Sequence, residues 1–270
     1  MLWGVSVWFI AAGVVALASP IVLTVGRWQM LHPRLALTAW FGAFSLGILL
    51  ALLGFAACVA ATLHAPESAP IAESVLLTTT GWCALGILGG VIGFVCSNAE
   101  PLAGLHRAGA TPVLSRSSER RSGFTLVRFD SAEPISYAVP GARPQIHVSS
   151  ELERVLTPEQ VRAVVAHEYA HLRQHHGAAI RIAQINALCL ARLRPGRALL
   201  RATLLLVELA ADDAAARHAR AVHLANALST LGRLTGDERM LLRADRLTHK
   251  RWRRASRRLL PAAVRTAVPE

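Results

Sequence analysis

Three long apolar stretches dominate the first part of the chain. They run from about Leu2 to Val25, from Leu35 to Leu63 and from Ser74 to Cys96. Each is long and uncharged enough to cross a bilayer, which takes about 20 apolar residues. Glycines recur in them; small residues let membrane helices approach closely, although glycine is also simply common in such helices. The pattern predicts three transmembrane helices, with a cleaved signal peptide as the alternative for the first stretch, although no basic residue precedes it.

The charges between these stretches predict an orientation. The first loop carries Arg27 and Arg34, the second carries Glu67 and Glu73 without Lys or Arg, and an arginine-containing sequence follows Cys96. Basic loops face the cytoplasm in most membrane proteins. We therefore expect a multi-pass protein of the cell membrane whose N-terminus lies outside and whose sequence after Cys96 is cytoplasmic.

The pattern changes after the third stretch, which divides the chain into a three-span transmembrane anchor, residues 1–97, and a cytoplasmic domain, residues 98–270. The sequence from Asn98 to about Ser122 is polar and typical of a linker. The runs "GFTLVRF", "ISYAVPG" and "PQIHVSS" predict a small β-sheet. Helical stretches follow, among them "AAIRIAQINALCLARL" and "RALLRATLLLVELAADDAAARHA". The predicted fold class is α+β, mainly α.

A strong helix start signal stands in "LTPEQV". Thr157 is a good N-cap, Pro158 suits the first helical position, and Gln160 can complete a capping box. We expect this helix to run to about His176, with Gly177 as its stop.

This helix carries the motif H-E-x-x-H at His167, Glu168 and His171. Residues i and i+4 share a helix face, so both imidazoles can bind one metal ion, and Glu168 stands where it can reach a metal-bound water. Zinc hydrolases need this arrangement, because a carboxylate takes the proton of the water that the metal makes acidic. The alternative is a helix with solvated His and Glu side chains.

A third ligand is expected from Glu208 in "VELAADD". Its long apolar lead-in indicates a buried carboxylate, which needs a partner. Asp212, one turn further on, is placed to hydrogen-bond a ligand imidazole. His175 is an alternative ligand, although His175 and the adjacent His176 more often would be solvated or contact a phosphate headgroup.

Composition and charge predict a basic surface near the C-terminus. The chain is 53% apolar and carries a formal net charge of +12. The stretch "RLTHKRWRRASRRLLP" near the C-terminus is strongly cationic, which favours contact with the anionic inner leaflet over nucleic acid or an acidic partner. A solvated helix without a partner remains open, and direct nucleic-acid binding is not expected. The four cysteines are interpreted as small apolar residues.

The stretches "VVAHEYAHLRQHH" and "ELAADDAAA", with the upstream "SYAVPGARPQIHVSSELERVLTPEQV", resemble the membrane-bound gluzincin metallopeptidases. The similarity is to the β-lactam sensor-transducer proteases, peptidase family M56, and to the related family M48 of HtpX and Ste24 type. It covers roughly residues 133–219. The chain has no apolar run after Glu208 that could lead to a sensor domain, so direct antibiotic sensing is not expected.

The resemblance implies one Zn²⁺ per chain, bound by His167, His171 and Glu208, with Glu168 as general base and Asp212 matching the aspartate that follows the third ligand. It implies a zinc metalloendopeptidase. Its expected substrate is a cytoplasmic or membrane protein, with a paired cytoplasmic transcriptional repressor as one candidate. The alternatives are an HtpX-like quality-control protease of membrane proteins and a non-catalytic membrane scaffold. Expected partners are the peptide substrate and the lipid bilayer, and a strand such as "QIHV" is expected to pair with an extended substrate.

Overall fold

The computed structural model describes residues 2–63, short interrupted pieces between 71 and 97, residues 115–191 and residues 193–250. These residues are mainly helical with one small four-stranded sheet, as the sequence predicted. Contacts group the chain into two compact units, residues 1–105 with 180–204 and residues 106–179 with 205–270. The domain boundary predicted between residues 97 and 98 lies where only isolated positions are described, so it stays a prediction.

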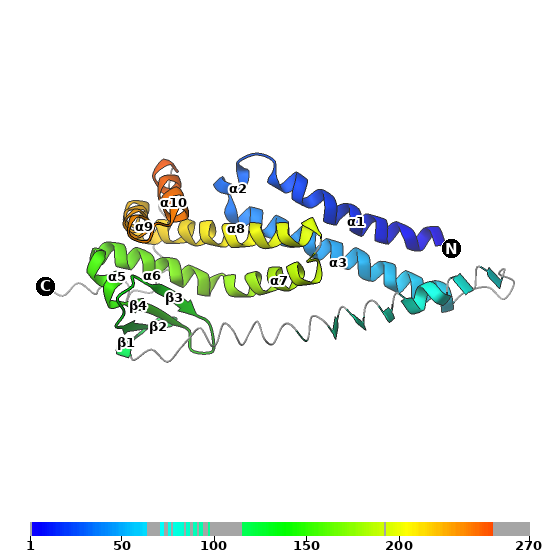
Figure 1. The fold of residues 1–270 in the computed structure, drawn as a ribbon, viewed down its shortest axis with the longest axis horizontal. Helices are drawn as coiled ribbons and strands as arrows, with labels where there is room; N and C mark the ends of the chain where they lie inside the picture. Colours follow the sequence, from blue (N-terminus) through cyan, green and yellow to red (C-terminus); the bar gives the residue numbers. More distant parts are fainter. Residues whose placement is uncertain are drawn as a thin grey trace. The chain divides into compact units, whose positions relative to one another are not determined.

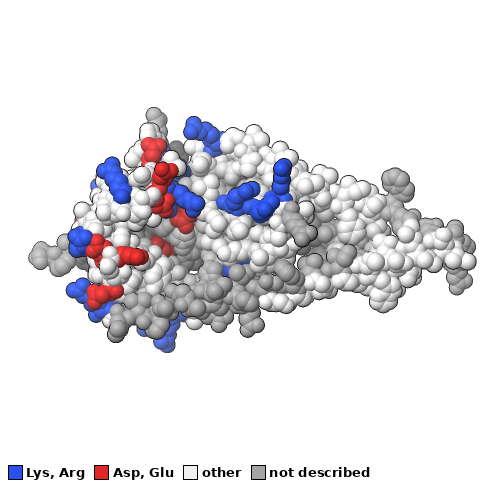
Figure 2. Space-filling model, viewed as in Figure 1, with Lys and Arg blue, Asp and Glu red and all other residues white. Residues whose placement is uncertain are grey.

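The first unit contains the N-terminal helices α1 (Leu2–Thr24), α2 (Trp28–Leu31) and α3 (Pro33–Leu63). Among the described residues, two segments are long and apolar enough to cross a membrane, Val5–Thr24 and Pro33–Ala61, a criterion of length and composition alone. Figure 2 shows no charged side chain along most of α1, which contains none in its sequence. The third predicted span, from Ser74 to Cys96, is described only in short interrupted pieces, so it stays a prediction.

Helices α1 and α3 pack closely at one glycine. A Cβ atom added to Gly54 would lie 2.9 Å from the ring of Phe9, so a larger residue would collide there. Phe9 also meets Phe55 edge-on, with 5.2 Å between ring centroids. By contrast, a Cβ added to Gly42 would meet nothing within 4 Å. Of these two glycines, only Gly54 has the packing role that small residues often have between membrane helices.

The second unit holds the sheet, with strands β1 (Ser115–Arg121), β2 (Phe124–Phe129), β3 (Ser136–Val139) and β4 (Gln145–Ser149) in the order β1-β2-β4-β3. The pair β2–β4 is parallel, and the pairs β1–β2 and β3–β4 are antiparallel. Strands β2, β3 and β4 confirm the three predicted β runs. Strand β1 lies within the predicted linker and contradicts that part of the prediction. The sequence did not reveal it, because an exposed edge strand of polar residues shows no alternation of apolar and polar positions.

The strand order also corrects the expected substrate strand. The segment "QIHV" belongs to β4, which pairs with β2 on one side and β3 on the other. Its backbone groups are therefore already used, and the prediction that it pairs with a substrate is wrong. Strand β3 pairs with β4 alone among the described strands, so β3 is the edge next to the helices.

The remaining described elements of the chain are helical. They are α5 (Ser150–Val155), α6 (Pro158–Arg173), α7 (His176–Cys189), α8 (Arg194–Ala219), α9 (Ala221–Thr235) and α10 (Glu238–His249). Helix α6 ends before the predicted stop at Gly177, because His175 adopts a left-handed conformation with φ 52° and turns the chain. Gly177 lies inside α7, so its prediction as the helix stop was wrong. The part of the predicted basic tail beyond Lys250 lies outside the described residues.

Helix α6 is buried between the sheet and other helices (Figure 1). One apolar cluster joins its Val164 and Val165 to the sheet through Phe124, Leu126, Ile146 and Val148. A second cluster joins its Ala163 and Ala166 to α8, α9 and α10 through Ala215, Leu224, Leu228 and Leu247. Each large apolar side chain buried in this way stabilises the fold by about 1.5–3 kcal/mol. Packing on both sides fixes the rotation of α6 and hence the direction of its polar side chains.

Candidate metal centre

Two histidines project from one face of α6. The helix begins as predicted, with the Thr157 side chain accepting from the backbone N–H of Gln160 and the Gln160 side chain accepting from that of Thr157. His167 and His171 follow one turn apart, and their Nε2 atoms lie 3.1 Å from each other. In a tetrahedral site with Zn–N bonds of about 2.0–2.1 Å, two ligand nitrogens stand about 3.4 Å apart. The two imidazoles therefore converge as ligands of one ion would.

Helix α8 brings a carboxylate to the same point. Glu208 Oε2 lies 3.4 Å from Nε2 of His167, and Oε1 lies 3.5 Å from Nε2 of His171. One ligand atom from each of the three residues falls within 4.8 Å of the other two. The Glu208 side chain is 36% exposed, so the point is reachable from solvent. Two imidazole nitrogens and one carboxylate oxygen are a donor set of catalytic zinc sites, and these residues fit that metal.

Asp212 stands behind His167. Its side chain is fully buried, and Oδ1 lies 3.1 Å from Nδ1 of His167, the ring nitrogen that faces away from Glu208. The sequence placed Asp212 one helical turn after Glu208 and predicted contact with a ligand imidazole; the structure brings Asp212 to His167.

Arg243 of α10 joins the two carboxylates. Its guanidinium lies 2.8 Å from Glu208 Oε2 and donates to both oxygens of Asp212, at 2.7 Å and 2.8 Å. Burial opposes ionisation of both acids, but His167 and Arg243 outweigh it, lowering the pKa of Glu208 to about 2 and holding the pKa of Asp212 well below its usual range. Both side chains are therefore carboxylates at neutral pH.

The two histidines differ in protonation. Burial alone would lower the pKa of His167, but contacts with Asp212 and Glu208 raise the pKa to about 9. Burial lowers the pKa of His171 to about 3, and the nearby positive charge of His167 adds to this effect. A metal ion needs neutral imidazole. Metal binding would therefore displace a proton from His167 at neutral pH, whereas His171 is already neutral.

Glu168 lies beside the cluster and is partly buried. Burial raises the pKa of its carboxyl, while the charge of His167 and a hydrogen bond from Ser136 oppose the shift. Ser136, on the edge strand β3, donates this bond from Oγ to Glu168 Oε1 at 2.8 Å. The motif glutamate is thus oriented by a residue of the sheet.

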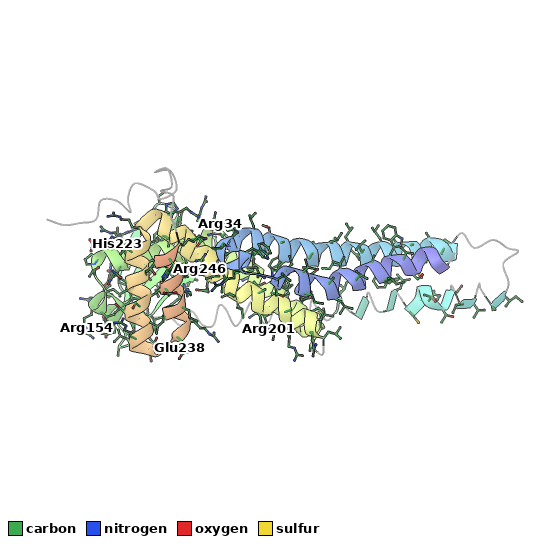
Figure 3. All side chains as sticks on the ribbon, turned by 90° about the horizontal axis from the view of Figure 1, so that it is seen from above. Arg34, Arg154, Arg201, His223, Glu238 and Arg246 are labelled. Atoms are coloured by element: carbon green, nitrogen blue, oxygen red, sulfur yellow. The ribbon has the colours of Figure 1, made fainter. Side chains whose placement is uncertain are left out.

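A second ion-pair cluster lies one residue beyond Asp212. Asp213 is almost fully buried and accepts from Arg246 at 2.7 Å and from Lys250 at 2.6 Å. Arg246, labelled in Figure 3, comes from α10, as does Arg243. These contacts fasten α10 to α8 at the level of the candidate site.

His175 and His176, which follow α6, differ from the environments that the sequence predicted for them. His175 is exposed at the turn, and the cluster of potential ligands comprises His167, His171 and Glu208 without it. His176 was expected to be solvated, but only 1% of it is exposed, and its Nδ1 lies 3.1 Å from Nδ1 of His171. The left-handed turn at His175 swings His176 back toward α6, which a continuous helix would not do.

Sequence reasoning also missed Ser136 and Arg243. Nothing in the sequence near Ser136 distinguishes it from other serines of the β runs. For Arg243 one signal existed, because two carboxylates expected to be buried on α8 require a cation to balance them. The two carboxylates predict a nearby cation, but they do not identify which of the many arginines provides it.

A family model described as peptidase family M48 matches residues 106–246, more than half of the 270-residue chain. The matched range contains every residue of the cluster described above, from Ser136 to Arg243. No curated protein and no solved structure is significantly similar to the chain.

Proposed function

Because the chain belongs to peptidase family M48, whose members are metallopeptidases, we propose that it is a membrane-bound zinc endopeptidase with a cytoplasmic catalytic domain. The convergence of Glu208 on the imidazoles of His167 and His171 carries this proposal. Of the two families that the sequence resembles, M48 is the one whose model matches, and the sensor-transducer family M56 has no such support.

In this proposal, His167 Nε2, His171 Nε2 and a carboxylate oxygen of Glu208 would hold one Zn²⁺ per chain. The bound ion would act as a Lewis acid that polarises the scissile carbonyl and lowers the pKa of a water in the remaining position. Asp212, whose Oδ1 lies 3.1 Å from Nδ1 of His167, is placed to orient this ring. Arg243 holds the carboxylates of Glu208 and Asp212 in place.

Glu168 is the proposed general base. It takes a proton from the attacking water and delivers it to the leaving amine, a role that favours a carboxyl with a raised pKa. The hydrogen bond from Ser136 occupies Oε1, so Oε2 is the oxygen left to accept the proton. Ser136 thus restricts the rotation of the base.

Strand β3 replaces β4 as the proposed substrate-binding edge. An extended peptide that pairs with β3 would lie beside Glu168, because Ser136 of this strand touches the glutamate. Backbone pairing gives affinity without demanding a particular sequence. This edge therefore suits a protease that accepts varied extended segments.

The substrate is proposed to be a protein reached at the membrane. Two apolar helices support a membrane location, and the loop charges support a cytoplasmic catalytic domain. Membership of family M48 favours quality-control cleavage of membrane proteins over cleavage of a paired repressor, which was the expectation drawn from M56. Contact of the basic tail with the inner leaflet remains part of the proposal.

The test uses the full chain expressed in cells as wild type, Glu168→Ala and the control Glu159→Ala, which changes a half-exposed glutamate in the first turn of the same helix. We expect fragments of membrane proteins to accumulate with wild type and the control but not with Glu168→Ala, while all three purified proteins retain one zinc. A paired repressor as the only cleaved protein would favour regulated proteolysis instead. Equal fragment patterns in all three would support the non-catalytic scaffold.

A further inference from the structure

His176 is a buried histidine that the proposed mechanism does not use. It is 1% exposed, and its ring meets that of His171 edge-on with 4.8 Å between centroids. The closest approach joins the two Nδ1 atoms at 3.1 Å, a hydrogen-bond distance. Each nitrogen can donate or accept, depending on which one carries the hydrogen.

The turn between α6 and α7 creates this contact. In a continuous helix, residues five apart in sequence do not share a face, so His176 would point away from His171. Instead α6 ends at Arg173, and His175 takes a left-handed conformation with φ 52°. His176 becomes the first residue of α7, and its side chain turns back under the candidate metal centre.

The direction of the hydrogen bond follows from the chemistry of a metal ligand. The Nε2 atom of His171 faces Glu208 and must keep its lone pair to bind a metal. The hydrogen of this neutral ring then stands on Nδ1 and needs an acceptor. For His167 the carboxylate next to Nδ1 is Asp212, 3.1 Å away; for His171 the group at hydrogen-bond distance from Nδ1 is Nδ1 of His176.

We propose that His176 is a positioning residue of the metal centre, whose Nδ1 accepts the Nδ1–H of His171 and thereby fixes the tautomer and ring orientation of this ligand. The inference rests on the proposed zinc site. It makes the centre asymmetric, with one ligand histidine supported by a carboxylate and the other by a neutral imidazole.

Two substitutions separate this role from simple packing. In His176→Asn, Oδ1 is bonded to Cγ as Nδ1 is in histidine, so an acceptor remains near the same position. In His176→Phe the ring remains and the acceptor is lost. A packing role predicts that Phe is tolerated and Asn is not, whereas the positioning role predicts the reverse. His175→Asn, at the exposed neighbouring position, is the matched control, since asparagine tolerates a left-handed conformation.

The measurement is the affinity of the purified full chain for Zn²⁺, by competition with a chromophoric chelator, with circular dichroism as a check on folding. We expect His176→Phe to weaken zinc binding about 10–100-fold, as loss of such outer partners does elsewhere. His176→Asn and the control are expected to stay within about threefold of wild type. Replacing zinc with Co²⁺ gives a second readout, because its visible spectrum changes when a ligand ring tilts.

The outcomes distinguish this inference from the proposed function. If wild type binds no stoichiometric zinc, the zinc-peptidase proposal itself fails. If wild type binds zinc but His176→Phe binds equally well, or His176→Asn loses as much affinity as Phe, the positioning role is wrong while the zinc site stands.

Discussion

The guanidinium of Arg243 grips both carboxylate oxygens of Asp212, through Nη2 at 2.7 Å and Nε at 2.8 Å. Asp212 is fully buried, and the same guanidinium also reaches Glu208. A bidentate pair of this kind fixes geometry as well as charge. The framework of the candidate metal centre is therefore held together by protein side chains.

Loss of the bidentate pair between Arg243 and Asp212 should destabilise the fold strongly. Replacing Arg243 by Gln leaves the buried carboxylate of Asp212 without its guanidinium, and breaking a buried pair in this way costs about 3–5 kcal/mol. Urea unfolding of the metal-free chain in detergent measures the change in free energy. Arg239→Gln, at an exposed site of α10, is the control and should change it by less than about 0.5 kcal/mol. Similar values for the two variants would contradict the structural role of Arg243.

Metal removal should inactivate the protein without unfolding it. In the metal-free protein, Arg243 and the protonated His167 together balance the charges of Glu208 and Asp212, and apolar clusters hold α6 on both sides, so the fold does not depend on the ion. After chelation we expect an unchanged far-ultraviolet circular dichroism spectrum, no peptide cleavage, and recovery of cleavage on addition of zinc. A large loss of helix signal on chelation would show instead that metal binding drives folding, as in small zinc domains.

The hydroxyl of Ser136 should matter for turnover. Ser136→Ala removes the hydrogen bond to Glu168 Oε1, and a bond to a charged group contributes about 1.5–3 kcal/mol. We expect kcat to fall about 10–100-fold with little change in zinc content, because the base loses its orientation. Ser136→Thr keeps a hydroxyl and suits a strand, so it should retain most of the activity. If Thr were as inactive as Ala, crowding at β3 rather than the hydrogen bond would be the cause.

His147 should make stability pH-dependent. It lies buried on β4, stacked on Tyr137 with 4.7 Å between ring centroids, and burial lowers its pKa. Between about pH 6.5 and the lower pKa of the folded protein, His147 binds a proton in the unfolded chain but not in the folded chain. The free energy of unfolding therefore falls as the pH decreases through this range. His147→Phe keeps an aromatic ring without titration. Relative to wild type, this variant should therefore be more stable at pH 5 than at pH 7.5, measured by urea unfolding. A constant difference at both values would contradict the lowered pKa.

The proposed orientation depends on the third span. In a chain whose four cysteines are replaced by alanine, a cysteine at Ser68 should react with an impermeant thiol reagent in right-side-out vesicles. A cysteine at Ala132, an exposed position of the second unit, should react only after the vesicles are disrupted. The two sites flank the third predicted span, so they lie on opposite sides of the membrane only if this span crosses it. Labelling of both sites in intact vesicles would therefore contradict the predicted topology.

Local signals in the sequence predicted much of the candidate site. The capping box at Thr157 and the spacing of His167 and His171 depend on residues three or four apart, whose neighbourhood a helix guarantees. The placement of Glu208 came from its apolar lead-in and from the family resemblance. Its distance from the two imidazoles agrees with that expectation.

What the sequence could not predict depends on tertiary placement. Arg243 lies 31 residues from Asp212 along the chain, and Ser136 lies 32 residues from Glu168. Their meeting is decided by how α10 and the sheet pack. His176 was missed for another reason, because a left-handed turn at His175 lacks the glycine that usually announces one. Strand β1 was missed because its polar residues have no buried face to alternate with.

The ion pair between Asp213 and Lys250 gives the protein an internal reporter. Lys250 is the only lysine of the chain, and its ammonium is occupied by a buried carboxylate. An acylating reagent at high pH therefore has one side-chain amine to find, and the ion pair with Asp213 slows its reaction there. The rate of that single modification, followed by mass spectrometry, would report how often this ion pair between α10 and α8 opens.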